Sequence, residues 1–248
     1  MSLPILETKV LYRKLLSLVQ PEIVFDIGSC DGSESIKAAK ILPKSTVVAF
    51  EANPTNFSQI IENSDIMKLG VSVHNMAIQN KDDNVFFNLI DAEKTKNKGS
   101  SSLLNKPNLD SEQIEVRGSR LDSFANKHYP LGKTLSLWID VEGAGYEVLE
   151  GIESTSDRIV FFQIEVEETQ IWEGQRTHND IIKIANSLGF YPIARGAGDF
   201  QYDMVFMNKD KGNEFDISRV LRETILVCRI RKFFILLREI KRKFIHKS

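Results

Sequence analysis

The segment Val24-Phe25-Asp26-Ile27-Gly28-Ser29-Cys30-Asp31-Gly32 decides the fold of this chain. Its first half completes a short apolar, β-branched run, residues 22–27, which predicts a buried strand. The glycines at 28 and 32 predict a tight turn that lets the backbone approach a ligand closely, and a helix over residues 33–42 follows. The spacing Asp-x-Gly-x-x-x-Gly differs from the Gly-x-Gly-x-x-Gly fingerprint that cradles a pyrophosphate. The segment therefore predicts an α/β fold whose ligand carries no pyrophosphate.

Beyond this segment, strands and helices alternate, which predicts a mostly parallel central sheet with helices on both faces and a terminal antiparallel strand. We expect one domain over residues 1–212 and a basic amphipathic helical extension over residues 213–248. Residues 91–110, rich in Lys, Asn, Ser and Gly, predict a long loop. The expected strands are residues 22–27, 46–50, 71–77, 114–118, 135–141, 158–166, 190–195 and 202–207, and the expected helices are residues 9–19, 33–42, 54–63, 122–127, 146–152 and 178–188.

A second acid, Glu51, ends the second expected strand 25 residues after Asp26. An acid at this position of an α/β sheet can accept hydrogen bonds from both hydroxyls of a ribose. S-adenosylmethionine combines a ribose with an amino acid end and no phosphate, so Asp26 would lie near its ammonium group or order the turn. The alternative for the two acids is a capped turn and a surface glutamate. The candidate cofactor-binding residues are Asp26, Gly28, Ser29, Gly32, Glu51, Ala52, Asn75, Ala77 and Asp140.

The most distinctive stretch of the chain is Leu137-Trp138-Ile139-Asp140-Val141-Glu142-Gly143-Ala144-Gly145-Tyr146-Glu147-Val148-Leu149-Glu150-Gly151. An apolar strand here delivers Asp140 and Glu142 to its carboxyl end, the edge at which α/β sheets bind ligands. The spacing of two residues along an extended strand places both acids on one side. Two close carboxylates can hold a cation, polarise a hydroxyl or raise each other's pKa. The alternative is that the acid at the strand end caps the next helix.

This stretch resembles the Ile-Asp-Val-Glu-Gly-Ala signature of the FkbM methyltransferase family. The resemblance extends over residues 24–207 and includes Phe50-Glu51-Ala52-Asn53-Pro54, Ser101-Ser102-Leu103 and Arg120-Leu121-Asp122-Ser123-Phe124. It implies a Rossmann-like class I methyltransferase fold and methylation of hydroxyls on sugars, polysaccharides or natural products. It also implies that Asp26, Gly28 and Glu51 bind S-adenosylmethionine, while Asp140 and Glu142 face the substrate. Two positions depart from the family: Ala52 stands where it often has Pro, and Gly145 where it often has an acid.

Transfer to an alcohol oxygen requires a group that takes or shares the hydroxyl proton. Asp140 is the first candidate for this role, with Glu142 beside it and His178, at the start of an expected helix, as a further one. A single histidine at that place is more often a capping or surface residue. Asp140 could instead hold Mg²⁺, but two acids are too few to define a magnesium site.

The main functional hypothesis is an S-adenosylmethionine-dependent O-methyltransferase that acts on a saccharide, a glycoconjugate or a natural product. One alternative is a protein that binds S-adenosylmethionine without catalysis. Another is a nicotinamide-dependent oxidoreductase, which the missing pyrophosphate fingerprint disfavours.

Charge is distributed unevenly along the 248 residues, whose net charge is −2. Ten Lys/Arg and two acids in residues 217–248 give +8, which leaves −10 for the rest. An apolar stripe at helical spacing runs through this basic segment and favours either an anionic membrane surface or docking on the same domain or on a second copy. Nucleic acid is not favoured, because no base-stacking aromatics alternate with polar groups. The stripe is Leu226, Ile230, Phe233, Leu237, Ile240 and Phe244.

Cys30 and Cys228 form neither a disulfide framework nor a zinc spacing, so we expect a reducing compartment. No secretory signal and no apolar run of about 18 residues is found in the sequence. These observations favour a cytoplasmic protein, with the inner face of a membrane as one place for it.

Overall fold

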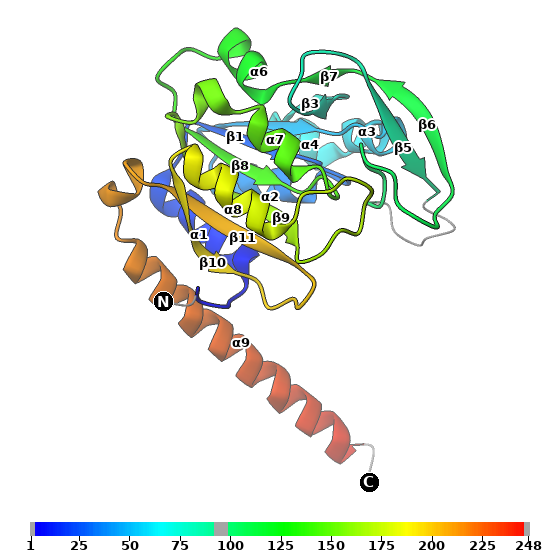
Figure 1. Ribbon diagram of the computed structural model, residues 1–248. Helices are drawn as coiled ribbons and strands as arrows, with labels where there is room; N and C mark the ends of the chain where they lie inside the picture. The colour runs from blue at the N-terminus through cyan, green and yellow to red at the C-terminus, as the bar shows by residue number, and fades with distance from the viewer. Residues whose placement is uncertain (1–2, 92–98, 246–248) are drawn as a thin grey trace.

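A computed structural model describes residues 3–91 and 99–245 (Figure 1). Its centre is a seven-stranded sheet in the order β10-β11-β9-β8-β1-β2-β3. In the described chain, β11 alone runs antiparallel to its neighbours, which confirms the predicted α/β, Rossmann-like sheet with a terminal antiparallel strand. The strands of this sheet are β1 (Ile23–Ile27), β2 (Thr46–Phe50), β3 (Ser72–His74), β8 (Leu135–Ile139), β9 (Ile159–Glu167), β10 (Phe190–Arg195) and β11 (Gln201–Asn208).

Helices cover both faces of the sheet, because the central strands are apolar on both sides. Alternate residues of β1 show this: Val24 packs toward α1 and α2, whereas Phe25 packs toward α6, α7 and α8. Two short helices, α3 and α4, connect β2 to β3. The helices are α1 (Thr8–Val19), α2 (Ser33–Ile41), α3 (Pro54–Glu62), α4 (Ser64–Leu69), α6 (Leu121–His128), α7 (Gly145–Glu150), α8 (His178–Ser187), α9 (Ile217–Ile245) and the 3₁₀ turns η1 (Glu153–Thr155) and η2 (Lys211–Glu214).

Four further strands form two small sheets of their own. The prediction of one strand over residues 71–77 is wrong, because the chain leaves the main sheet after β3 and pairs again as β4. Asn75 is the reason: its side-chain amide donates to the carbonyl oxygens of Glu51 (2.8 Å) and Ala52 (3.1 Å) and turns the backbone there. A hairpin of β5 and β6 was not expected, and the predicted strand over 114–118 is divided between β6 and β7. These strands are β4 (Ala77–Ile78), β5 (Val85–Ile90), β6 (Ser111–Val116) and β7 (Gly118–Ser119).

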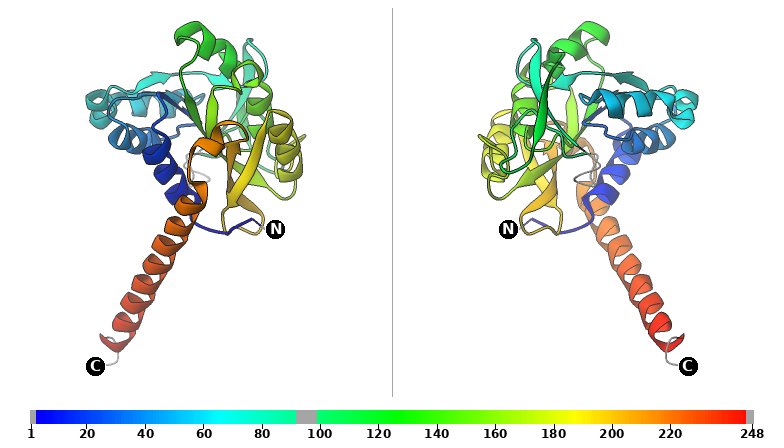
Figure 2. Two further views of the ribbon diagram at one scale, coloured as in Figure 1. Left: turned by 90° about the vertical axis from the view of Figure 1, so that its left-hand side faces the viewer. Right: turned by 90° about the vertical axis from the view of Figure 1, so that its right-hand side faces the viewer.

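Helix α9 is attached to the domain along its first three turns and then projects away from it (Figures 1 and 2). Val220, Thr224 and Cys228 are buried against the face of the sheet that α1 covers. Leu226 and Phe233, which belong to the predicted apolar stripe, are each 58% exposed. A different face of the helix therefore does the docking. The side chains of Leu237, Ile240 and Phe244 lie outside the described set, and none of the described helices is long and apolar enough to cross a membrane.

Candidate active site

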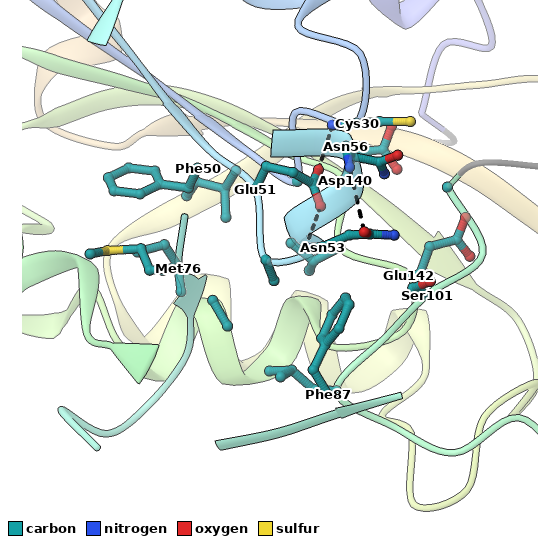
Figure 3. A pocket seen from close by; sticks show the side chains of 18 of the residues that line it. Cys30, Phe50, Glu51, Asn53, Asn56, Met76, Phe87, Ser101, Asp140 and Glu142 are labelled. Carbon is teal, nitrogen blue, oxygen red and sulfur yellow. Dashed lines mark hydrogen bonds between the residues drawn. The ribbon is translucent and has the colours of Figure 1, made fainter. Parts of the chain in front are cut away.

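A cavity of about 370 Å³ opens at the carboxyl ends of β1, β2 and β8 (Figure 3). The β5–β6 hairpin and the segment that follows residue 98 close its other side. Six of the residues predicted from the sequence line it, and they come from four separate parts of the chain: Gly28, Glu51, Ala52, Ala77, Asp140 and Glu142.

Glu51 is held in this cavity by two backbone hydrogen bonds. Its Oε2 accepts from the N–H of Cys30 at 2.7 Å, and its Oε1 accepts from the N–H of Asn53 at 2.8 Å. Each carboxylate oxygen keeps a further lone pair for a ligand hydroxyl. Burial raises the pKa of Glu51 to about 7, although the two backbone hydrogen bonds act to lower it. The carboxylate is thus oriented and poorly solvated, which suits a paired acceptor for a diol.

The turn after β1 requires left-handed backbone at Gly28 (φ 84°) and Cys30 (φ 52°). At Gly28 an added Cβ would lie 2.0 Å from the carbonyl oxygen of Asp140, so only glycine lets β1 and β8 end side by side. The N–H groups of Gly28 and Ser29 both donate to the carbonyl of Phe50 at 3.0 Å. Cys30 is a non-glycine residue in a sparsely populated conformation, and the same conformation directs its N–H to Glu51.

Asp26 lies beneath the turn and does not line the cavity. It is 2% exposed, and its Oδ2 accepts from the hydroxyl of Ser35 at 2.5 Å. Burial raises its pKa to about 6. Of the two roles considered for Asp26, this placement corresponds to ordering the turn. Ser29 and Gly32 are likewise outside the lining; Ser29 donates to the carbonyl of Asp26, and Gly32 precedes α2.

One wall of the cavity is apolar. Asn75 contributes no side chain to it, because its amide is engaged with the backbone of Glu51 and Ala52. The apolar lining is completed by Phe50, Met76, Ile78, Phe87 and Leu103.

Asp140 lies where β8 ends, and its N–H still donates to the carbonyl of Ile27 at 2.9 Å. Its side chain accepts no hydrogen bond from residues 3–91 or 99–245, and the carboxylate faces the cavity (Figure 3). Burial raises the pKa of Asp140 above its ordinary value, and the nearby charge of Asp203 raises it further, while Lys9 opposes both. An aspartate in this state is a better proton acceptor near neutral pH than an exposed one.

Glu142 also lines the cavity and adopts a left-handed conformation (φ 44°). The hydroxyl of Ser102 donates to its carbonyl oxygen at 2.6 Å. The following Gly143 lies flat against Trp172, where an added Cβ would be 2.4 Å from the indole ring. Burial and then the charge of Asp140 raise the pKa of Glu142 to about 7. Trp172 is 1% exposed and thus supports this loop from the core.

His178 is not brought to the cavity. It begins α8, and its Nδ1 lies 3.1 Å from Oε2 of Glu168. Glu168 also accepts from the hydroxyl of Tyr202 at 2.6 Å. His178 therefore belongs to a separate polar cluster, away from Asp140 and Glu142.

The donor set does not fit a preformed magnesium site. Within residues 3–91 and 99–245, no group of three His, Cys, Asp or Glu side chains is arranged to hold a metal ion. Asp140 and Glu142 alone supply too few oxygen ligands for Mg²⁺.

The sequence reasoning did not predict several lining residues, among them Asn53, Cys30 and Phe87. Asn53 carried a readable signal, since an Asn before a Pro is a favoured helix cap, and its Oδ1 accepts from the N–H of Thr55 at 2.9 Å. Cys30 carried none, because its role is a backbone N–H. Phe87 comes from β5, which was not expected at all.

The methyltransferase FkbM domain family matches residues 26–192. The 2-O-methyltransferase NoeI of Sinorhizobium fredii (strain NBRC 101917 / NGR234) is 26% identical over 212 residues, which cover 79% of this chain and 84% of that protein. Among solved structures, the N-terminal domain of EvdMO1 with SAH bound gives a TM-score of 0.47 at 9% identity, with 82% of each chain covered. Precorrin-6y C5,15-methyltransferase from Geobacter metallireducens GS-15 gives 0.44 at 11% identity, over 81% of this chain and 86% of that one. These two structures are too distant to assign any residue.

Proposed function

The chain belongs to the FkbM methyltransferase family, and from this premise we propose that it moves the methyl group of S-adenosylmethionine to a hydroxyl oxygen of a saccharide, glycoconjugate or natural product. The observation that carries the proposal is the shared cavity of Glu51 and Asp140. Two backbone N–H groups orient Glu51, whereas the side chain of Asp140 accepts no hydrogen bond from the part of the chain that the structure describes.

The described residues fit S-adenosylmethionine group by group. Glu51 would accept from the two ribose hydroxyls, since both of its oxygens are fixed in place. Met76 and Phe87 belong to the apolar wall, which suits a flat adenine ring. The turn at Gly28, with no phosphate fingerprint, would receive the amino acid end. This fit favours S-adenosylmethionine over a nicotinamide dinucleotide.

When bound, S-adenosylmethionine supplies a methyl group that is activated by the positive charge of its sulfonium. Asp140 would hold the acceptor hydroxyl in line and take its proton as the C–O bond forms and the C–S bond breaks. Burial, which raises the pKa of Asp140, makes the protonated product form of this carboxylate less costly. Glu142 would accept a hydrogen bond from a neighbouring hydroxyl of the acceptor.

The first experiment is titration calorimetry with S-adenosylhomocysteine, NADH and NADPH. Selective binding of S-adenosylhomocysteine supports the proposed cofactor. Preference for a nicotinamide would contradict it and favour an oxidoreductase.

The second experiment compares Asp140→Asn with the exposed Asp157→Asn. We expect Asp140→Asn to bind S-adenosylhomocysteine within about threefold of the native chain and to lose methyl transfer by about 100-fold or more. Transfer is measured with radiolabelled S-adenosylmethionine and a panel of methyl hexosides, methyl 6-deoxyhexosides and their N-acetylamino counterparts. Full activity of Asp140→Asn would remove Asp140 from the mechanism. Cofactor binding by the native chain without transfer to any acceptor would favour the non-catalytic alternative.

We also propose that the projecting part of α9 lies against an anionic membrane surface, at the inner face of a membrane. Ile230 and Phe233 are 46% and 58% exposed on this part of the helix, and Leu226, on the outer side of the docked turns, is 58% exposed. Arg229 and Arg238 are exposed beside them. An exposed apolar strip flanked by arginines is complementary to anionic headgroups over an acyl layer, and each such arginine contributes about 1 kcal/mol near the surface.

The structure shows where to cut α9 for a test. Removal of all of residues 217–248 would uncover the core at Val220 and Cys228, whereas removal of residues 230–248 leaves the docked turns in place. We expect the shortened protein to keep its thermal stability and to lose sedimentation with phosphatidylcholine–phosphatidylglycerol vesicles. Equal sedimentation of both forms would contradict a membrane role. A dimer of the full chain that the cut converts to a monomer would assign α9 to self-association instead.

A further inference from the structure

A second cavity, of about 670 Å³, lies between the N-terminal segment, the turn from β10 to β11 and the docked part of α9. The N-terminal segment is fixed beside β10, because the N–H of Arg195 donates to Pro4 and the N–H of Leu6 donates to Arg195, both at 3.0 Å. The polar and charged residues of this lining are Glu7, Thr8, Lys9, Tyr202, Asp203 and Arg229.

A row of three carboxylates crosses the end of the main sheet between the two cavities. Ile139 pairs with Ile164, so Asp140 and Glu165 are level with each other on β8 and β9. Glu165 in turn pairs with Asp203 on β11. Neighbouring strands are about 4.8 Å apart, and residues that are level across them point to the same face. Asp140, Glu165 and Asp203 therefore form one continuous row.

The row points to the face of the sheet that α1 covers. Trp138 lies two residues before Asp140 on β8, and Val205 lies two residues after Asp203 on the antiparallel β11. Both pack in the core beneath α1. At the start of α1, the hydroxyl of Thr8 donates to Asp203 at 3.1 Å. Lys9 lowers the pKa of both Asp140 and Asp203, which agrees with its place beside the row.

The ends of the row belong to different cavities. Asp140 and Glu165 line the cavity that holds Glu51, whereas Asp203 lines the second one. On the basis of the function proposed above, we propose that the second cavity is the acceptor-binding groove, and that a neutral, hydroxyl-rich sugar enters there and extends along the row to Asp140.

The chemistry of the row selects this class of acceptor. Carboxylates accept hydrogen bonds from sugar hydroxyls and repel a phosphate, sulfate or carboxylate on the acceptor. Burial, followed by the charges of Asp140, Glu142, Asp203 and Glu167, raises the pKa of Glu165 far above its ordinary value. This shift favours the protonated form of Glu165 more than in an exposed glutamate. A protonated carboxyl donates as well as accepts, so the row can bind a hydroxyl in either sense.

The test maps where a sugar binds to the full chain saturated with S-adenosylhomocysteine. NMR titration uses methyl hexosides, methyl 6-deoxyhexosides and their N-acetylamino counterparts at millimolar concentrations. We expect shifts of amide signals in residues 5–9 and 196–203. The exposed Ala197 at the rim is replaced in Ala197→Trp to fill the groove, and Lys183→Trp on the exposed face of α8 is the matched control. Only the rim variant should abolish the shifts, and both should bind S-adenosylhomocysteine as the native chain does.

A second variant keeps the test informative if Ala197→Trp does not fold. Asp203→Asn keeps the size of the side chain but removes one charge of the row, and we expect the sugar to bind at least about tenfold more weakly. Shifts confined to other surfaces, shifts that persist in Ala197→Trp, or no shifts with any sugar would each overturn the groove. Failure of the proposed function is separate, because it appears in the native chain itself, either as absent S-adenosylhomocysteine binding or as cofactor binding without methyl transfer to any acceptor.

Discussion

Single residues with left-handed backbone determine the shape of the cavity that Glu51 and Asp140 line. Gly28 brings β1 against β8, Cys30 turns its N–H toward Glu51, and Glu142 presents its side chain beside Asp140. Two of these three are not glycines, so the fold retains a conformational cost of about 1 kcal/mol or more at each. Such cost persists where the surroundings fix the conformation, as Ser102 does for Glu142.

Glu51→Gln tests the ribose site. One half of the new amide would be an NH₂ group facing the N–H of Cys30 or of Asn53, so a donor would meet a donor. We expect S-adenosylhomocysteine to bind about 10- to 100-fold more weakly, as calorimetry would show. The exposed Glu62→Gln should bind normally. Equal affinity of the two variants would mean that Glu51 does not contact the cofactor.

Gly28→Ala tests the turn. The new Cβ would lie 2.0 Å from the carbonyl oxygen of Asp140, at a φ of 84° that alanine rarely adopts. We expect a lower melting temperature and at least about tenfold weaker S-adenosylhomocysteine binding, because the ends of β1 and β8 must separate. Gly70→Ala is the control, since it shares a positive φ but has open space around it. A loss of binding equal in both variants would assign the effect to backbone strain alone.

At the level of elements, the part of the fold that follows from local pattern was predictable. The apolar runs predicted the bounds of β1, β2, β8 and β9 to within one or two residues. The turn at Gly28 indicated where the cavity lies. The break between β3 and β4 was not readable, because it depends on the Asn75 amide reaching Glu51, 24 residues away. The pairing of β5 with β6 was not predictable either. A connection of 20 residues separates the two strands, so no short turn with a recognisable sequence joins them.

The hydrogen bonds that hold the loop after β8, which carries Glu142, can be tested through Ser102→Ala. The hydroxyl of Ser102 donates to the carbonyl of Glu142 and accepts from the N–H of Leu104, so its loss frees both segments. We expect methyl transfer to fall by about 10-fold, with S-adenosylhomocysteine affinity nearly unchanged, because Glu142 faces the acceptor side. Rates are measured under saturating cofactor. Ser58→Ala on the exposed side of α3 is the control. Equal rates of the two variants would contradict a role for the hydrogen bonds of Ser102.

For the whole molecule, carboxylates buried in the cavity and near it make stability depend on pH. The pKa of each of Glu51, Glu142 and Glu167 is raised from 4.5 to about 7, mainly by burial. Between these values the native state binds more protons than the unfolded state, so the free energy of unfolding falls as pH rises. His74, whose pKa burial lowers, acts in the opposite direction but is a single group.

We therefore expect the free energy of unfolding to decrease from pH 5 to pH 7 by a few kcal/mol, on the order of 1–3 kcal/mol for each fully buried group. Urea unfolding at pH 5, 6, 7 and 8 without cofactor measures this slope. A double variant, Glu142→Gln with Glu167→Gln, should flatten it. Stability that rises steadily over the same range would show that these carboxylates are well solvated in the native state.

Helix α9 also fixes a dimension of the molecule. It is docked as far as Cys228 and continues to Ile245, about 25 Å farther at 1.5 Å per residue. If this projecting part lies along an anionic surface as proposed above, the domain and its acceptor groove would be held beside that surface. An acceptor anchored there would then be chosen by reach as well as by chemistry, since only hydroxyls that extend from the surface to the groove arrive at Asp140. Shortening the projecting part would weaken this tether, so that methylation of surface-anchored sugars falls while methylation of free sugars is kept.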